Sequence, residues 1–184
     1  KFSSKIFKKK PKNLIGVTGT NGKSSIANFY FQILTLNRIK AASIGTLGVN
    51  GLKVQKNFSN TTFDTIQINK ILKKLKERRI ENVILEASSH GLNQNRLDGL
   101  EFDIGIFTNL TRDHLDYHKT FKNYFNSKLI LFKNLLKKKS YAIYDNDLEI
   151  SSDLNKITRL NKIKKLTLGN TKSNFAIIDH QFLK

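Results

Sequence analysis

The chain has 184 residues, of which 39% are hydrophobic, so it can bury one sizeable core, and its lack of cysteine excludes a disulfide framework and a thiolate metal site. Its formal net charge of +19 suggests a nucleic-acid partner, but the lysines are dispersed along the chain, and we expect a solvated basic surface that binds no nucleic acid. No apolar run approaches the roughly 18 residues of a membrane span, and the N-terminal stretch lacks the apolar core of a signal peptide, which predicts a cytoplasmic protein without membrane contact.

The first part of the chain predicts a linker followed by strands and a helix. Residues 1–12 are basic and polar, contain the only proline, and are expected to form the linker. A buried strand is expected at 13–18, a helix after Lys23 and a second strand at 41–46. The expected buried face of the helix consists of Ile26, Phe29, Ile33 and Leu34. Asn50-Gly51, between apolar residues, predicts a hairpin.

The rest of the chain continues this alternation. A helix is expected at 64–79, with Ile68, Ile71, Leu72 and Leu75 along one stripe. The remaining expected elements are strands at 82–91 and 102–110, a helix at 121–136, a strand at 141–147 and weaker strands at 165–169 and 175–179. Lys137-Lys138-Lys139 are expected at a helix end, where cations favourably meet the helix dipole. The pattern predicts an α/β fold with a mostly parallel sheet flanked by helices.

Polar residues follow three of the expected strands. The strands end at Thr18-Gly19, at Glu86 and Ser88, and at Thr108-Asn109, which precede Asp113-His114. In open parallel sheets, ligands bind in the crevice outside the carboxyl ends of the strands. One edge of the sheet is therefore expected to gather these side chains.

The segment GVTGTNGKSS, residues 16–25, lies between an expected strand and an expected helix. It ends like a phosphate-binding P-loop, although Val17 stands where the usual spacing has its first glycine. Gly19 and Gly22 supply a permissive backbone, Lys23 a positive charge and Ser24 a hydroxyl that faces a metal ion. The context favours a phosphate cradle over a glycine-rich turn with a chance lysine.

Other candidate residues leave alternatives open. Glu86 at a strand end suits a Mg²⁺ ligand, or else an ordinary solvent-exposed strand end. His90 is expected to be a structural hydrogen-bonding residue. The cluster that contains His114 suits metal or acid-base chemistry, and equally turn formation and helix capping. Lys128 by itself is expected to be a surface lysine. These residues together indicate a Mg-nucleotide enzyme that transfers a phosphoryl group to an unknown acceptor.

Taken together, the motifs resemble those of the Mur ligase family, ATP-dependent amide-forming enzymes of peptidoglycan synthesis. The family loop T-G-T-N-G-K-[TS] matches residues 18–24, and an aliphatic residue is common in it at the position of Val17. N-T-T is found at 60–62, E-x-S-S-H-x-L at 86–92 with Gln94 and Arg96 after it, and F-T-N-L-x-x-D-H-L-D-Y-H at 107–118, followed by Lys128. These elements are most similar to those of the members that add the third residue to UDP-N-acetylmuramoyl-L-alanyl-D-glutamate.

The resemblance implies a role for each matching residue. Those implied to bind ATP are Gly19, Thr20, Asn21, Gly22, Lys23, Ser24 and Ser25. Those implied to hold the muramoyl-peptide are Asn60, Thr61, Thr62, Ser88, Gln94 and Arg96. Those implied to hold two Mg²⁺ ions are Ser24 for the first and Glu86, His114 and carbamylated Lys128 for the second. Lys23, Lys128 and His114 are implied to be catalytic.

The resemblance also implies a reaction and a domain organisation. ATP would activate the γ-carboxylate of the UDP-N-acetylmuramoyl-dipeptide as an acyl phosphate, which a free amino acid would convert to an amide. Residues 13–184 would be an incomplete central ATP-binding domain, residues 1–12 a linker from an N-terminal domain, and the C-terminal amino-acid-binding domain would be absent. We expect a monomer that does not turn over alone. The added amino acid, whether lysine, diaminopimelate or another, stays open.

Two other functions remain as alternatives. One is another ligase of the same family, either a different muramoyl step or a folylpolyglutamate-type enzyme. The other is a basic P-loop NTPase that binds nucleic acid, which the net charge suggests but which leaves the N-T-T, S-S-H and D-Y-H elements unexplained.

Overall fold

The computed structural model describes residues 10–52, 61–170 and 172–176, and within these ranges eight strands form one sheet. The strands are β1 (Asn13–Thr18), β2 (Ala41–Gly45), β3 (Gly48–Asn50), β4 (Asn82–Glu86), β5 (Phe102–Phe107), β6 (Leu136–Asp145), β7 (Lys164–Gly169) and β8 (Phe175–Ala176). Their order is β3-β2-β4-β1-β5-β6-β7-β8, and each neighbouring pair is parallel except β2 with β3. The predicted α/β fold with a mostly parallel sheet is confirmed.

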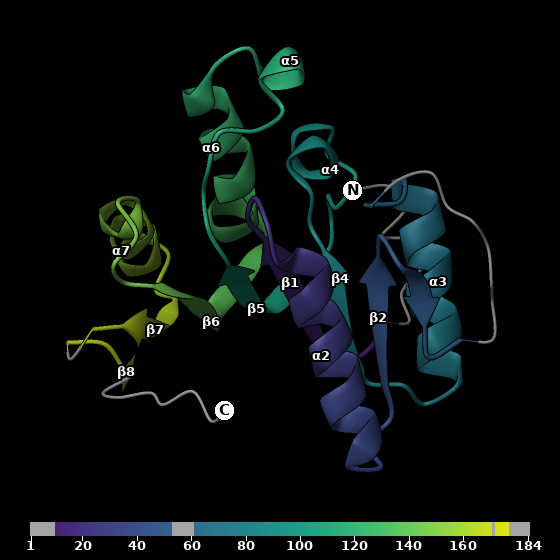
Figure 1. Ribbon diagram of the computed structural model, residues 1–184. Coiled ribbons are helices and arrows are strands. Elements are labelled where there is room, and N and C mark those ends of the chain that lie inside the picture. Colours follow the sequence, from purple (N-terminus) through teal and green to yellow (C-terminus); the bar gives the residue numbers. More distant parts are fainter. Residues whose placement is uncertain (1–9, 53–60, 171, 177–184) are drawn as a thin grey trace, which may run out of the picture.

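Helices lie on both faces of the sheet (Figure 1). They are α2 (Lys23–Leu36), α3 (Thr65–Glu77), α4 (Ser89–Asn93), α5 (Leu115–His118), α6 (Phe121–Ile130), the π-helical segment η1 (Leu131–Leu135) and α7 (Ser151–Leu160). Helix α2 covers one face over β2, β4 and β1, and the opposite face carries α3, α6 and α7. In the part of the chain that the structure describes, no helix is long and apolar enough to cross a membrane.

Alternating side chains of the central strands pack into two apolar clusters. Ile15, Val17 and Ile84 pack with Ala27 of α2. Their sequence neighbours, such as Val83, belong to the larger core on the other face, which includes residues of α3, η1 and α7. Because successive strand residues point to opposite faces, the apolar runs predicted as strands are buried on both sides.

The predicted buried face of α2 is partly wrong. Phe29 and Ile33 are 59% and 58% exposed, whereas Ala27 is buried and Ile26 and Tyr30 pack beside it. The helix faces the sheet through its smallest apolar side chain, which allows close approach of helix to strands. An apolar side chain therefore does not by itself identify the buried face, because the sheet needs only one stripe of the helix.

Three smaller predictions also differ from the structure. The described hairpin joins β2 to β3 through Thr46 and Leu47, so its turn precedes Asn50-Gly51, and the residues from 53 to 60 lie outside the described ranges. Lys137-Lys138-Lys139 belong to β6 instead of a helix end, and Lys137 pairs with Asp103 at 2.7 Å. Helix α7 was not predicted, because its sequence has few apolar residues; of these Leu154 and Ile157 are buried.

Candidate functional site

The carboxyl ends of β1, β4 and β5 lie side by side at one edge of the sheet. The register pairs Val17 of β1 with Glu86 of β4, and Thr18 with Phe107 of β5. This register places the loop after β1, the end of β4 and the loop after β5 next to one another at the carboxyl edge of the sheet. The structure thus brings together the three polar strand ends that the sequence predicts at one edge.

The P-loop-like segment after β1 is hydrogen-bonded to the loop after β5. The backbone N–H of Thr20 donates to the carbonyl of Asn109 at 3.0 Å, and that of Asn21 donates to the Asn109 side chain at 2.9 Å. Thr108 Oγ1 donates to the Asn21 carbonyl at 2.6 Å. Gly19 has a φ of 143°, and a Cβ there would lie 1.8 Å from Thr108 Oγ1, so only glycine fits.

Lys23 and Ser24 begin helix α2 and point back to the site. Lys23 Nζ donates to the carbonyls of Gly19 and Thr20 at 3.0 and 2.7 Å. Burial lowers the pKa of Lys23, and the nearby Glu86 carboxylate opposes that shift. Ser24 Oγ donates to Glu86 Oε2 at 2.9 Å, while Ser25 is exposed. A positive charge and a hydroxyl therefore lie together at a helix N-terminus, as phosphate binding requires.

Glu86 is a buried carboxylate, only 2% exposed, so the alternative of a solvent-exposed strand end is wrong. Besides the Ser24 hydroxyl, it accepts hydrogen bonds from Thr46 N at 3.0 Å and Thr46 Oγ1 at 3.1 Å. Gly45 leaves room for it, because a Cβ there would lie 2.1 Å from Glu86 Oε1. The carboxylate is thus held in place by neutral donors and lies near the Lys23 charge.

Lys128 is 1% exposed, so the expectation of a surface lysine is wrong. Its Nζ donates to the Gly19 carbonyl at 2.6 Å and lies 4.2 Å from the centre of the Tyr124 ring. Burial, together with the charge of Lys23, lowers its pKa from 10.5 to about 7. At neutral pH a large fraction of Lys128 is therefore an uncharged amine, which is the nucleophilic form.

The predicted substrate-binding residues form a second hydrogen-bonded group. Thr62 Oγ1 donates to the Glu86 carbonyl at 2.8 Å and accepts from the backbone N–H of Ser88 at 3.0 Å. Arg96 Nη1 donates to the Thr62 carbonyl at 2.7 Å. Thr61 contacts Thr46 through its hydroxyl at 3.1 Å. Asn60 lies outside the described residues.

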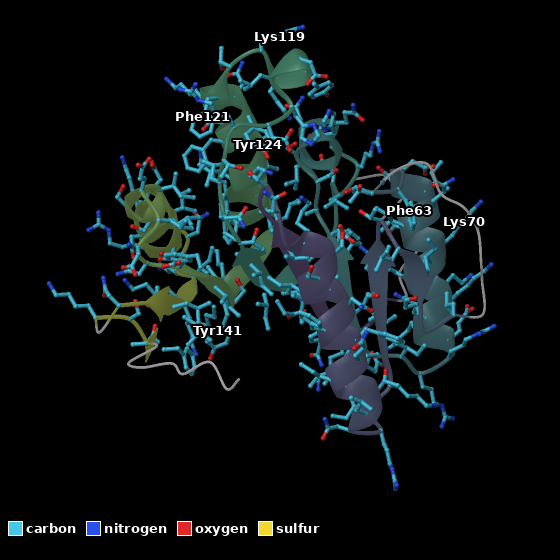
Figure 2. The ribbon with its side chains drawn as sticks, in the orientation of Figure 1. Phe63, Lys70, Lys119, Phe121, Tyr124 and Tyr141 are labelled. Atoms are coloured by element: carbon cyan, nitrogen blue, oxygen red, sulfur yellow. The ribbon has the colours of Figure 1, made fainter. Side chains whose placement is uncertain are left out.

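Both groups line one cavity of about 450 Å³. Its lining residues are Lys23, Thr61, Thr62, Ser88, Ser89, His90, Gln94, Arg96, His114, Tyr117, Tyr124 and Lys128. Tyr124, on α6, marks the end of the molecule at which the cavity lies (Figure 2). The described lining contains three Lys or Arg residues and no Asp or Glu, so the cavity suits an anionic ligand with several oxygen acceptors.

Aromatic rings of α4, α5 and α6 form one wall of the cavity. The His90 ring lies 4.8 Å from that of His114, 4.2 Å from that of Tyr117 and 5.4 Å from that of His118. Tyr117 and Tyr124 are not among the site residues predicted from the sequence. Tyr117 lies within the D-Y-H element, whereas only the fold brings Tyr124 to the cavity.

The predicted metal ligands do not form a cluster of charged ligands by themselves. Ser24 and Glu86 are hydrogen-bonded, whereas His114 Nε2 lies 3.5 Å from Asp113 Oδ2, on the side of His90. Within the described ranges, no three His, Asp or Glu side chains are close enough to hold a metal ion. Any metal ion here would need further oxygen ligands from bound molecules or from a modified side chain.

Residues 17–183 match the Mur ligase middle domain. The chain belongs to the Mur ligase family. This membership confirms the resemblance of the P-loop, S-S-H and D-Y-H elements. Val17, at the position of the missing P-loop glycine, is fully buried under α2.

Relatives of this Mur ligase domain are longer proteins. A UDP-N-acetylmuramoyl-L-alanyl-D-glutamate--2,6-diaminopimelate ligase of Rickettsia bellii (strain RML369-C) is 44% identical over 169 residues, which are 89% of this chain and 35% of that protein. A solved structure of a ligase with that name has a TM-score of 0.82 at 33% identity and covers 97% of this chain and 36% of the other. Folylpolyglutamate synthase of Mycobacterium tuberculosis, with a TM-score of 0.74 at 11% identity over 99% of this chain and 48% of its own, shares the fold. The chain thus spans about a third of the length of the ligases that it matches.

Proposed function

We propose that this Mur ligase domain is the ATP-binding and catalytic part of an enzyme that adds 2,6-diaminopimelate to UDP-N-acetylmuramoyl-L-alanyl-D-glutamate. The observation that carries the proposal is the cationic cavity that joins the P-loop to Thr62, Ser88 and Arg96. The relatives' name supplies the identity of the substrate and of the amino acid. ATP, the phosphoryl donor, and the substrate carboxylate, the phosphoryl acceptor, would then meet between Lys23 and Arg96.

The segment from Gly19 to Ser25 is proposed to bind the ATP phosphates. Its glycines adopt positive φ, 143° at Gly19 and 84° at Gly22, which turns the loop around the start of α2. Backbone N–H groups at a helix N-terminus and the Lys23 ammonium attract phosphate oxygens. Lys23 Nζ donates to two loop carbonyls, which carry only partial negative charge. A triphosphate carries full negative charge and would therefore replace these carbonyls as the hydrogen-bond partner of Lys23.

Mg²⁺ is proposed to bind beside Glu86. The buried carboxylate, with the Ser24 hydroxyl on one oxygen, offers the hard oxygen ligands that Mg²⁺ prefers alongside phosphate oxygens and water. Ser24 would hold the first ion, and Glu86, His114 and carbamylated Lys128 the second. When bound, Mg²⁺ would neutralise negative charge on the phosphates.

Carbamylation of Lys128 is supported by its environment. The uncharged amine nitrogen forms a bond to the carbon of CO₂ and loses one proton, which gives an N-carboxylate. A pKa of about 7 makes this amine available near neutral pH. The product would place a negative charge near Lys23, whose positive charge is the second largest cause of the low pKa.

The proposed ligase reaction has two steps, and the first brings two negatively charged groups together. The γ-carboxylate of the substrate attacks the γ-phosphorus of ATP and releases ADP, which gives an acyl phosphate. An amino group of 2,6-diaminopimelate then attacks the acyl carbon, loses a proton and expels inorganic phosphate. Because carboxylate and triphosphate repel each other, the protein must supply positive charge around both. Lys23 and Arg96, which both line the cavity, supply it, and the Thr62-Ser88 pair positions the acyl substrate.

The test uses a full-length protein that contains this chain. ATP consumption should require both UDP-N-acetylmuramoyl-L-alanyl-D-glutamate and 2,6-diaminopimelate, and mass spectrometry should detect the tripeptide product. Lysine in place of 2,6-diaminopimelate tests the amino acid separately. Turnover of ATP without either co-substrate, or with a folate in place of the muramoyl-peptide, would refute the proposal. A monomer and a cytoplasmic location stay predictions, and sedimentation of the same protein tests the first.

A further inference from the structure

Tyr117 is fixed in the wall of the cavity by two imidazole rings. Its ring centre lies 4.2 Å from that of His90 and 4.7 Å from that of His118, which meets it edge-on. Helix α5, which carries it, is a single turn bounded by two residues with positive φ, His114 at 51° and Lys119 at 65°. The side chains of this turn contact His90 of α4, and His118 also contacts Tyr124 of α6.

Two amide groups of α4 and its C-cap determine the direction of the Tyr117 hydroxyl. Asn93 Nδ2 and Gln94 Nε2 each donate a hydrogen bond to the phenolic oxygen at 3.1 Å. A phenolic oxygen accepts two such bonds and has one hydrogen of its own to donate. Because both neighbours are donors, that hydrogen must point to a third partner. The two bonds also lower the pKa of Tyr117, which makes its hydroxyl a better donor.

The third partner lies on the cavity side. Tyr117 lines the cavity together with Arg96, Lys128 and the other residues described above, among which no described Asp or Glu offers a carboxylate. The described contacts give this hydrogen no acceptor within the protein, which leaves it available to a molecule bound in the cavity. Tyr117 accepts a hydrogen bond from Gln94, one of the predicted substrate-binding residues, and lines the cavity together with Thr62 and Arg96. Of the two anionic reactants, the acyl substrate is the one proposed to bind these residues.

We infer that Tyr117 donates its phenolic hydrogen to a carbonyl or carboxylate oxygen of the acyl substrate, and that Gln94 acts through Tyr117 as a positioning residue. This inference rests on the proposed function. It changes the role predicted for Gln94, whose amide nitrogen is directed to the Tyr117 oxygen. Asn93 shares the positioning role from the adjacent residue.

The test is Tyr117→Phe in a full-length protein, with Tyr141→Phe as the matched control. Tyr141 is 37% exposed on β6 and does not line the cavity. Loss of one hydrogen bond to a charged group should raise the KM for UDP-N-acetylmuramoyl-L-alanyl-D-glutamate roughly tenfold. The KM for ATP and the Tm should stay within about twofold and a few degrees of the wild type.

The result is read as the ratio of the two KM values. A ratio that rises at least about threefold over the wild type in Tyr117→Phe, and not in Tyr141→Phe, supports the inference. A smaller change, or an equal change for both substrates, overturns it. A wild-type protein that forms no tripeptide at all refutes the proposed function, and the inference falls with it.

Gln94→Ala tests the positioning role. Alone it should raise the same KM less than Tyr117→Phe does, because the phenol remains but its hydroxyl is less well oriented. Added to Tyr117→Phe, it should raise that KM by less than about twofold, since the group that it positions is gone. Equal effects of Gln94→Ala in both backgrounds would show instead that Gln94 binds the substrate directly, which overturns its positioning role.

Discussion

Replacing Lys128 by methionine should stabilise the fold while abolishing ligase activity. The lysine amine is 1% exposed and lies near the like charge of Lys23, which together hold its pKa at about 7. In the unfolded chain the same amine has its ordinary pKa of 10.5. On folding at neutral pH, the Lys128 amine must therefore either lose its proton or become buried with its charge, and either costs free energy. Methionine has a similar length and no such cost.

The magnitude follows from the shift. A change from 10.5 to about 7 corresponds to an upper limit of about 4 kcal/mol at pH 7. Loss of the hydrogen bond to the Gly19 carbonyl offsets about 1 kcal/mol of this. That carbonyl keeps Lys23 as a donor at 3.0 Å, so it is not left unpaired. We expect a net gain of about 1–3 kcal/mol in the free energy of unfolding.

The free-energy cost of burying Lys128 depends on pH. Because the folded pKa lies below the unfolded one, the cost is fully present below about pH 7 and vanishes as the pH rises through 10.5. Urea unfolding of the wild-type chain and of Lys128→Met, in CO₂-free buffer between pH 6 and pH 10, should therefore show two stability curves that converge at high pH.

The exposed Lys122→Met, on the same helix, is the control and should leave the curve unchanged. A Lys128→Met variant that is less stable than the wild type at pH 7 would refute the assignment of a buried amine with a lowered pKa. Addition of bicarbonate should stabilise the wild type alone if the proposed carbamate forms.

Three further substitutions, together with Gly48→Ala as a control, test the geometry of the site. Gly19→Ala should lower the free energy of unfolding by about 2–4 kcal/mol, because its Cβ would lie 1.8 Å from Thr108 Oγ1, whereas Gly48→Ala has open space and should cost about 1 kcal/mol. Gly45→Ala should displace the Glu86 carboxylate and raise the Mg²⁺ concentration that half-maximal activity requires, and an unchanged Mg²⁺ titration of activity would argue against that ligand. Thr62→Val should cost about 1–3 kcal/mol in urea unfolding, because it leaves the Glu86 carbonyl and the Ser88 N–H without their 2.8 and 3.0 Å partner.

The strands and the edge at which they end could be predicted from sequence because both depend on local patterns. Buried parallel strands are continuous apolar runs, and the short apolar runs within residues 13–18 and 82–86 fit this pattern. The polar residues that follow such runs must lie at the carboxyl edge. This reasoning places Gly19, Glu86 and the loop after β5 together without any knowledge of side-chain contacts.

Features that depend on packing could not be predicted in the same way. Burial of Lys128 arises because α6 brings its amine to the Gly19 carbonyl of the P-loop. Local apolar patterning does not distinguish it from the exposed Lys122, and only the family resemblance singled it out. Phe29 and Ile33 are exposed because α2 presents Ala27 to the sheet. The link from Gln94 to Tyr117 joins residues 23 positions apart and depends on the placement of two short helices.

The central position of β1 has a consequence for biosynthesis. Its two neighbours, β4 and β5, come much later in the chain, with β5 ending at Phe107. At about 5–20 residues per second, a ribosome needs roughly 4 to 18 s after completing β1 to finish β5. Throughout that interval the apolar strand β1 has two unpaired edges, so the nascent chain is most prone to aggregation before the carboxyl edge of the sheet exists.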